Sequence, residues 1–174
     1  LVEVILSESR RVVRAVKDVL IVEHRLGLVM ANAGVDQSNV ADPHGRPLAL
    51  LLPQDPDASA ARVRDELRSR LGCNVGVVIN DSFGRPWRVG TVGVAIGCAG
   101  LPAVLDLRGV RDLFGRTLQT TILAYADEIA AAASLLMGQA DESRPVVLVR
   151  GLRRDEEHQS ARALLRPVRE DLFQ

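Results

Sequence analysis

The sequence has few aromatic residues, a single lysine and no excess charge of either sign. Aromatic residues make up 3% of the 174 residues, Lys17 is the only lysine, and the formal net charge is zero. Proteins that bind nucleic acid carry a basic surface and often stack bases on aromatic side chains, so this composition argues against a nucleic-acid partner. The phosphate-binding loop that ends in Gly-Lys-Ser/Thr is also excluded, because no glycine precedes Lys17.

Cysteine, histidine and long apolar runs are scarce as well. The two cysteines, Cys73 and Cys98, lie far apart in the sequence, and we expect buried, reduced thiols of a cytoplasmic protein rather than a disulfide. The histidines His24, His44 and His158 stand singly, without the spacing of a zinc site, and His24 is expected to be structural. No apolar run reaches the roughly 18 residues of a membrane span, so no membrane partner is expected.

The hydrophobic pattern predicts a globular chain in which helices and strands alternate. Helices are expected over residues 2–16, 55–72, 121–138 and 155–165. Strands are expected over residues 19–24, 27–34, 48–53, 74–80, 90–100 and 145–151. The helix over 55–72 has the clearest boundaries, with Asp55 or Asp57 as its cap, Pro56 in its first turn and Gly72 after its end. We expect an α/β or α+β fold, a mixed sheet with flanking helices, in a single domain over residues 1–174.

Three segments place oxygen-bearing side chains beside apolar runs. The first holds Asp36, Ser38 and Asn39, the second holds Asp81 and Ser82, and the third is the loop over residues 139–144. Carboxylate, hydroxyl and amide oxygens suit hard cations such as Mg²⁺ or Mn²⁺, which bind substrate phosphates. Two such ions can hold a phosphoryl group during its transfer.

Each segment also has a purely structural interpretation. Asp81 can cap a turn after a strand, Asp36 can form an Asx turn with Ser38, and residues 139–144 can be a solvated loop. Spacing alone therefore leaves a metal and phosphate site as one of two interpretations.

The segment after Asp81 raises the same question. Arg85 and Arg88 are either surface cations or ligands for an anion. Trp87, the only tryptophan, is either an anchor in the core or in an interface, or a platform on which a substrate stacks.

Eight segments of the sequence carry a resemblance to a known family. In order, they are AGVDQSNV, LLPQDPDASA, INDSFGRPWR, VAIGCAG, DLRG, ADEIAAAASLLMG, VVLVRG and LLRPVREDLF. Together they resemble the coenzyme F420-0:L-glutamate ligase family, also called F420 gamma-glutamyl ligase. The resemblance implies the fold of that family, a homodimer, and a GTP-dependent ligase that joins L-glutamate to coenzyme F420-0. It further implies an amide and then gamma-glutamyl linkages, an acyl-phosphate intermediate, Mg²⁺ or Mn²⁺, and a monovalent cation as a further candidate.

The resemblance also assigns roles to single residues. Matched motif by motif, Asp36, Asp81 and Ser82 are metal ligands and Asn39 is a contact for GTP. Gln139 faces the nucleotide and a metal, and its neighbours Gly138, Ala140 and Asp141 face the nucleotide.

The sequence departs from the family pattern in two places. It opens on Leu1, after the amino-terminal segment in which the family carries GTP-contacting lysine and serine motifs, so we expect that segment to be missing here. Val89, Thr91 and Gly93 stand where many members have Asn, Gln and Asp. A related metal- and nucleotide-dependent amide ligase for another acid, and a non-catalytic remnant, therefore stay open. Trp87 and the glycine-rich run 90–100 are the first candidates for dimer contacts.

Overall fold

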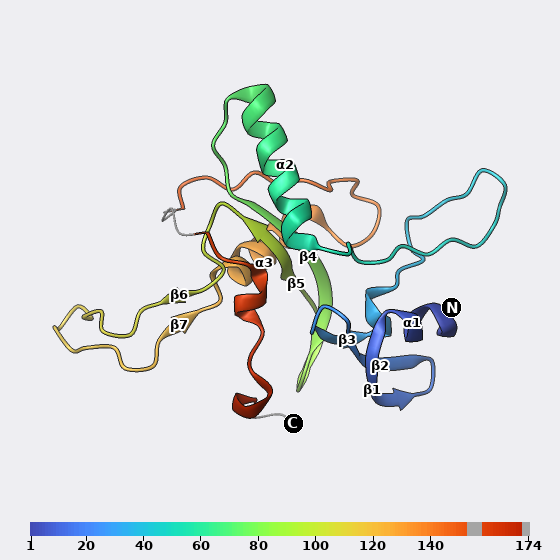
Figure 1. The fold of residues 1–174 in the computed structure, drawn as a ribbon, viewed down its shortest axis with the longest axis horizontal. Coiled ribbons are helices and arrows are strands. Elements are labelled where there is room, and N and C mark those ends of the chain that lie inside the picture. The colour runs from blue at the N-terminus through green and yellow to red at the C-terminus, as the bar shows by residue number, and fades with distance from the viewer. Residues whose placement is uncertain (153–157, 172–174) are drawn as a thin grey trace.

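A long antiparallel ribbon of two strands, β4 (Val77–Arg85) and β5 (Arg88–Ala99), runs through the middle of the molecule (Figure 1). The computed structural model describes residues 1–152 and 158–171. Helices α2 (Pro56–Leu71) and α3 (Tyr125–Met137) pack against the ribbon, mainly on β5. The ribbon therefore connects the two main helices.

Two further antiparallel sheets lie within the described residues. Strands β1 (Ser9–Val16), β2 (Val19–His24) and β3 (Val29–Ala31) form the first, and β6 (Leu105–Asp106) pairs with β7 (Ile122–Leu123) in the second. The other elements are the short helix α1 (Val2–Ser7) and the 3-10 helices η1 (Asn32–Gly34), η2 (Ala161–Leu164) and η3 (Val168–Glu170). The α+β class is confirmed, and the pairing is antiparallel in each of these sheets. None of the helices in the described ranges is long and apolar enough to cross a membrane.

The ladder between β4 and β5 contains a bulge. Ile79 pairs with Gly97 and Asn80 pairs with Ala95, which leaves Ile96 without a residue opposite it. Side chains alternate along a strand, so one extra residue reverses the face on which all later side chains lie.

The reversed alternation decides which helix each half of β5 faces. A Cβ atom at Gly93 would lie within 3 Å of the Ala130 carbonyl oxygen of α3, and one at Gly97 would lie as close to Pro56 of α2. The glycines thus permit two helices to approach opposite faces of one strand. Residues 95–99 of the run proposed for dimer contacts are buried inside the chain, whereas Gly90 and Thr91 are exposed, so only the start of the run is left as a candidate contact.

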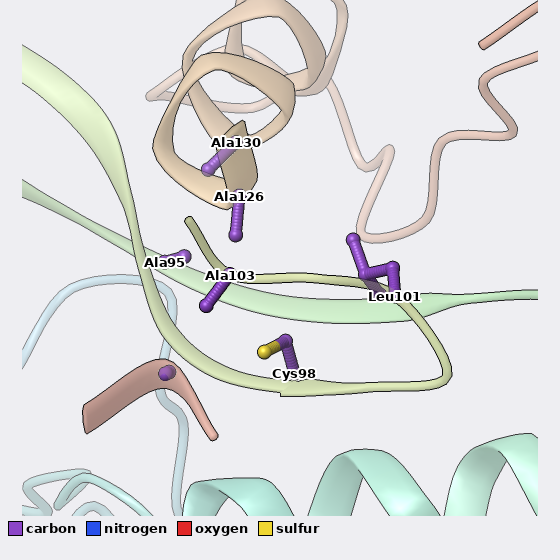
Figure 2. Close-up of a cluster of buried hydrophobic side chains, with 7 residues drawn as sticks. Ala95, Cys98, Leu101, Ala103, Ala126 and Ala130 are labelled. Atoms are coloured by element: carbon purple, nitrogen blue, oxygen red, sulfur yellow. The ribbon is translucent and has the colours of Figure 1, made fainter. Parts of the chain in front are cut away.

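The main core is built from small side chains (Figure 2). Its buried members are Ala95, Cys98, Leu101, Ala103, Ala126, Ala130 and Ala161. Alanines on β5 and on α3 bring strand and helix close together, which fixes their relative position. Cys98 is buried and free, as expected, and burial raises the pKa of its thiol to about 11. Cys73 is also free, but it is exposed, so the prediction of its burial is wrong.

The locally encoded elements are confirmed. The predicted helix at 55–72 is α2, and the predicted strands at 19–24 and 90–100 are β2 and β5. The helix predicted over 121–138 is α3, but it begins only at Tyr125, because Ile122–Leu123 pair with β6 as β7. Asp55 caps α2 by accepting the Ala58 N–H at 2.9 Å, and Gly72 ends the helix in the left-handed conformation. His24 is fully buried, and its Nδ1 atom accepts the Leu26 N–H at 3.0 Å, as a structural histidine would.

Several other predicted elements are wrong. The helix over 2–16 ends at Ser7, and residues 9–16 form β1 because they pair with β2. The run 48–53 forms only a bridge at Leu50, and residues 145–151, all of them described, form no strand. Of the helix predicted over 155–165, residues 155–157 lie outside the described part, and residues 161–164 form the 3-10 helix η2 rather than an α-helix. The strand at 27–34 shortens to β3 and is followed by η1.

Candidate functional site

Asp36 lies in the loop that follows η1. Its main chain forms two hydrogen bonds with Leu50, at 3.1 and 2.7 Å. Its carboxylate accepts the Ser38 N–H at 2.7 Å and the Ser38 hydroxyl at 2.8 Å. This is the Asx turn that the sequence permits, and it holds the Asp36 carboxylate in one orientation while leaving lone pairs on both oxygens.

Asp81 and Ser82 lie inside β4, where they pair with Val94 and Gly93. The predicted strand end at residue 80 is therefore wrong, because β4 continues with β5 to the hairpin turn at residues 86–87. Consecutive residues of a strand point to opposite faces, so the two side chains reach different neighbours. The Oδ1 atom of Asp81 accepts the Ser82 N–H at 2.8 Å.

The third segment is the turn that follows α3. Gly138 ends the helix with φ 77° and ψ −174°, a conformation that suits glycine alone. The carboxylate of Glu142 folds back into this turn and accepts the Ala140 N–H at 2.9 Å. The N–H groups of Ala140, Glu142 itself and Gln139 hold the pKa of the Glu142 carboxyl below its usual value. Sequence reasoning placed Glu142 in this loop but missed that it braces the turn; an acid a few residues after a helix-ending glycine is the available signal.

The three segments meet in the fold. The amide of Asn39 donates a hydrogen bond to the Ala140 carbonyl oxygen at 3.0 Å, across 101 positions of sequence. The hydroxyl of Ser82 donates to Oε1 of Gln139 at 2.9 Å. The first and second segments are linked by charge, since Asp36 acts on the ionisation of Asp81. Asp141 lies in the same turn with an exposed side chain.

The pKa of Asp81 is raised above the ordinary value for an aspartate. Burial of its carboxyl is the largest cause, and the negative charge of Asp36 adds to it. The hydrogen bond from the Ser82 N–H acts in the opposite direction but does not cancel the effect. A positive charge between two neighbouring carboxylates stabilises their ionised forms. The surroundings of Asp81 therefore favour a bound cation.

The oxygen donors of this site fit a hard cation. They are the carboxylates of Asp36 and Asp81, the Ser82 hydroxyl and the side-chain carbonyl of Gln139. Such donors suit Mg²⁺ or Mn²⁺, which retain several waters and need only one or two carboxylates. No group of three or more His, Cys, Asp or Glu residues placed to hold a metal ion occurs within the described ranges, so the candidate site would rely on hydroxyl, amide and water oxygens beside its two carboxylates.

The hairpin turn beyond the site is exposed. Trp87 adopts φ 62° and is 92% exposed, so it is not a core anchor. Arg85 and Arg88 pair with each other at the end of the ladder and are exposed as well. The turn thus presents two cations and an aromatic ring to the surroundings.

Comparison with known proteins gives a consistent result. A family model described as F420-0:Gamma-glutamyl ligase matches residues 1–151. The chain is 51% identical to the coenzyme F420:L-glutamate ligase of Methanopyrus kandleri, over 99% of the chain and 68% of that relative. Relatives of the same name from Methanothermobacter thermautotrophicus and Methanocaldococcus jannaschii are 49% and 45% identical, again over 99% of the chain and over 68% and 67% of their own lengths.

Proposed function

The chain belongs to the F420-0:gamma-glutamyl ligase family of enzymes, and we propose that it joins L-glutamate to coenzyme F420-0 at the site around Asp81. The observation that carries the proposal is the meeting of three distant segments. Asn39 and Ser82 each form a hydrogen bond to the turn after α3, and Asp36 influences Asp81. These are the segments to which the family resemblance assigns metal and nucleotide contacts.

The proposed reaction makes an amide from a carboxylate, which is a poor acylating agent. The γ-phosphoryl group of GTP is transferred to a carboxylate oxygen of the coenzyme precursor, giving an acyl phosphate and GDP. The amino group of L-glutamate then attacks the acyl carbon, loses a proton, and displaces inorganic phosphate. Positioning and charge stabilisation dominate phosphoryl transfer, so the protein's main task is to hold the reacting groups in line.

Asp36 and Asp81 would hold one Mg²⁺ or Mn²⁺ ion, and Ser82 and Gln139 would contribute to a second, because Asp81 and Ser82 point to opposite faces of β4. The fit rests on the hard oxygen donors and on the raised pKa of Asp81, to which the neighbouring charge of Asp36 contributes. A bound divalent ion supplies charge neutralisation to phosphate oxygens. The strand β4 holds Asp81 and Ser82, and the Asx turn orients Asp36.

The turn over residues 138–141 and the side chain of Asn39 would contact the nucleotide. Asn39 already orients the turn through the Ala140 carbonyl, and Gln139 lies against Ser82. A displacement of this turn would therefore change both the nucleotide contacts and the position of the metal ligands Gln139 and Ser82. A monovalent cation is a further component to vary in the assay.

Product mass tests the proposed function. The chain is incubated with GTP, L-glutamate, coenzyme F420-0 and Mn²⁺, with and without K⁺, and the product is analysed by mass spectrometry. One glutamyl group added, with GDP formed in equal amount, supports the proposal. If coenzyme F420-0 gives no product but another acid in its place is converted to an amide with GTP consumed, the chain is a related amide ligase. Absence of any heat on calorimetric titration with GTP and Mn²⁺ would point to a non-catalytic remnant.

A second copy of the chain is the proposed protein partner. The accessible surface is 12,542 Å², whereas a compact monomer of 18.8 kDa exposes about 8,300 Å². The difference of roughly 4,000 Å² exceeds what one partner contributes to a large permanent interface. Exposed apolar side chains stand at two turns, Trp87 at the ribbon tip and Leu113 and Phe114 at the tip of the arm between β6 and β7, which projects from the body (Figure 1).

The arm tip has a defined conformation, as an interface element needs. The Asp112 carboxylate accepts the N–H groups of Phe114 and Arg116, at 2.9 and 2.8 Å. Light scattering should give the mass of a dimer for the unmodified chain and of a monomer for Phe114→Ser. Leu135→Ser, which changes an exposed leucine on α3, is the control and should stay dimeric. A monomeric unmodified chain would refute the partner proposal.

A further inference from the structure

We propose that Asp127 is a positioning residue for Asp81, because its carboxylate hydrogen-bonds the bulged segment of β5 that sets the register of β4. The proposal rests on the proposed metal role of Asp81. Asp127 belongs to α3 and lies outside the three segments of the candidate site. It is a positioning residue because its contact is with the main chain of β5.

The contact lies at the bulge. The Oδ1 atom of Asp127 accepts the Ala95 N–H at 2.8 Å. Ala95 pairs with Asn80, and the next pair along the ladder is Val94 with Asp81. The hydrogen bond therefore holds the β5 main chain at Ala95, the residue that follows Val94, which lies opposite Asp81.

The other side of the bulge is held in the same way. The Oδ1 atom of Asp57, in the first turn of α2, accepts the Cys98 N–H at 2.9 Å. Asp57 also accepts the Ala161 N–H at 3.0 Å and the Ser160 hydroxyl. Two carboxylates, each from the first turn of a helix, thus fix β5 before and after Ile96.

The bulge needs support because a regular ladder is an available alternative. If the extra residue were absorbed, Asp81 would pair with Ala95, and the residues of β4 and β5 would shift relative to one another. The shift would move the Asp81 and Ser82 side chains relative to Asp36 and Gln139. The hydrogen bond to Asp127 favours the observed register, because only that register places the Ala95 N–H against α3.

The helix that carries Asp127 is itself fixed to β5. Ala126 and Ala130 of α3 are buried against Ala95 in the main core (Figure 2). Asp127 is half-buried, and burial raises the pKa of its carboxyl while the Ala95 N–H lowers it. A carboxylate beside an apolar core needs a hydrogen-bond partner, and the Ala95 N–H supplies one for Asp127.

The test compares three variants of the full chain. Asp127→Ala removes the acceptor, whereas Asp127→Asn keeps an oxygen acceptor and removes the charge. Glu128→Gln is the matched control, since it removes the neighbouring negative charge in the same helical turn, from an exposed side chain. Calorimetry measures Mn²⁺ affinity, and hydrogen exchange measures the protection of amides over residues 80–83 and 93–96.

We expect Asp127→Ala to bind Mn²⁺ about tenfold more weakly, as is usual when a group that supports a metal ligand is lost. Its amides over 80–83 should exchange faster, and Asp127→Asn should restore both properties to near the unmodified values. Glu128→Gln should change neither. Unchanged Mn²⁺ affinity and exchange in Asp127→Ala would overturn the proposal.

Two further outcomes remain decisive. If Asp127→Ala fails to fold, Asp127→Asn decides: loss of Mn²⁺ affinity in a folded Asn variant would overturn the positioning role. If the unmodified chain binds no Mn²⁺, the proposed function fails, and exchange alone decides the present proposal. Faster exchange over 80–83 in Asp127→Ala with rescue by Asp127→Asn would then support it, and unchanged exchange would overturn it.

Discussion

The hydroxyl of Ser82 donates a hydrogen bond to the side-chain oxygen of Gln139 at 2.9 Å, across 57 positions of sequence. This bond joins the central ribbon to the turn after α3, so two proposed metal ligands touch each other directly. Each keeps a lone pair for a cation, because the hydroxyl uses only its proton and the amide oxygen accepts only once in this bond.

Replacing Ser82 tests whether its oxygen is used. Ser82→Ala removes both the bond to Gln139 and a proposed ligand, and we expect Mn²⁺ affinity to fall by about tenfold or more. Ser82→Thr keeps the hydroxyl and should retain most of the affinity. Calorimetric titration with Mn²⁺ measures both variants, and equal affinities for Ala and Thr would exclude a role for the hydroxyl.

The pH dependence of Mn²⁺ binding tests the ionisation of Asp81. The carboxyl must lose its proton to bind a metal, and its pKa is raised by burial and by the charge of Asp36. Mn²⁺ affinity should therefore fall with decreasing pH at a higher pH than an ordinary aspartate would give. A titration of affinity against pH measures this, and a midpoint at or below the ordinary aspartate value would contradict it.

The same shift predicts how Asp81 affects stability without metal. A folded-state pKa above the unfolded value means that the folded state binds the proton more tightly. The stabilisation is present below the unfolded pKa and is lost as pH rises through the folded pKa. At neutral pH, Asp81→Asn should thus be at least as stable as the unmodified chain in urea. A clear loss of stability would show that the charged form is favoured by folding.

Gly138 tests the turn after α3. A Cβ atom there would meet the carboxylate of Glu142, so Gly138→Ala should push this side chain away from the Ala140 N–H that it accepts, loosen the turn and weaken GTP binding. Gly109→Ala is the control, because Gly109 also has a positive φ but has open space around its Cα. Fluorescent GTP-analogue binding should fall for the first variant only. An equal loss of GTP-analogue binding in both variants would show that strain at a positive φ, and not the contact with Glu142, causes the loss.

The two cysteines should differ sharply in reactivity. Cys73 is exposed, whereas Cys98 is buried with a thiol pKa of about 11. At pH 8, iodoacetamide should modify Cys73 in the native chain and leave Cys98 unmodified until urea is added. Peptide mass mapping checks the order, and early modification of Cys98 would contradict the packing of the main core.

Local signals in the sequence predicted some elements well. The cap Asp55, the first-turn Pro56 and the terminal Gly72 act within one helix, so α2 could be read from its own residues. The strand β1 could not be predicted in this way, because its valines also fit a partial helical stripe. Its pairing with β2 determines that these residues form a strand. The apolar run at 145–151 has a strand composition, yet Val146 is 84% exposed and the run pairs with no strand among the described residues.

The candidate site was only partly accessible from sequence. Oxygen-bearing residue types were visible at Asp36, Asp81 and Gln139, but their proximity depends on contacts between segments far apart in the chain. The family resemblance named these residues, and the fold brings their segments together. The glycines of 90–100 indicate a strand with a bulge or a close backbone contact, and β5 has both. The place of the bulge at Ile96 and the bond from the Ala95 N–H to Asp127 could not be predicted, because they depend on how two strands pair.

The most direct test of the proposed function is turnover by Asp81→Asn. The unmodified chain and the variant are each given GTP, L-glutamate, coenzyme F420-0 and Mn²⁺, and glutamylated product is measured by mass spectrometry after circular dichroism has verified folding. We expect product from the unmodified chain and none above background from a folded Asp81→Asn. Full activity in that variant would contradict the metal-binding role of Asp81 and the site built around it.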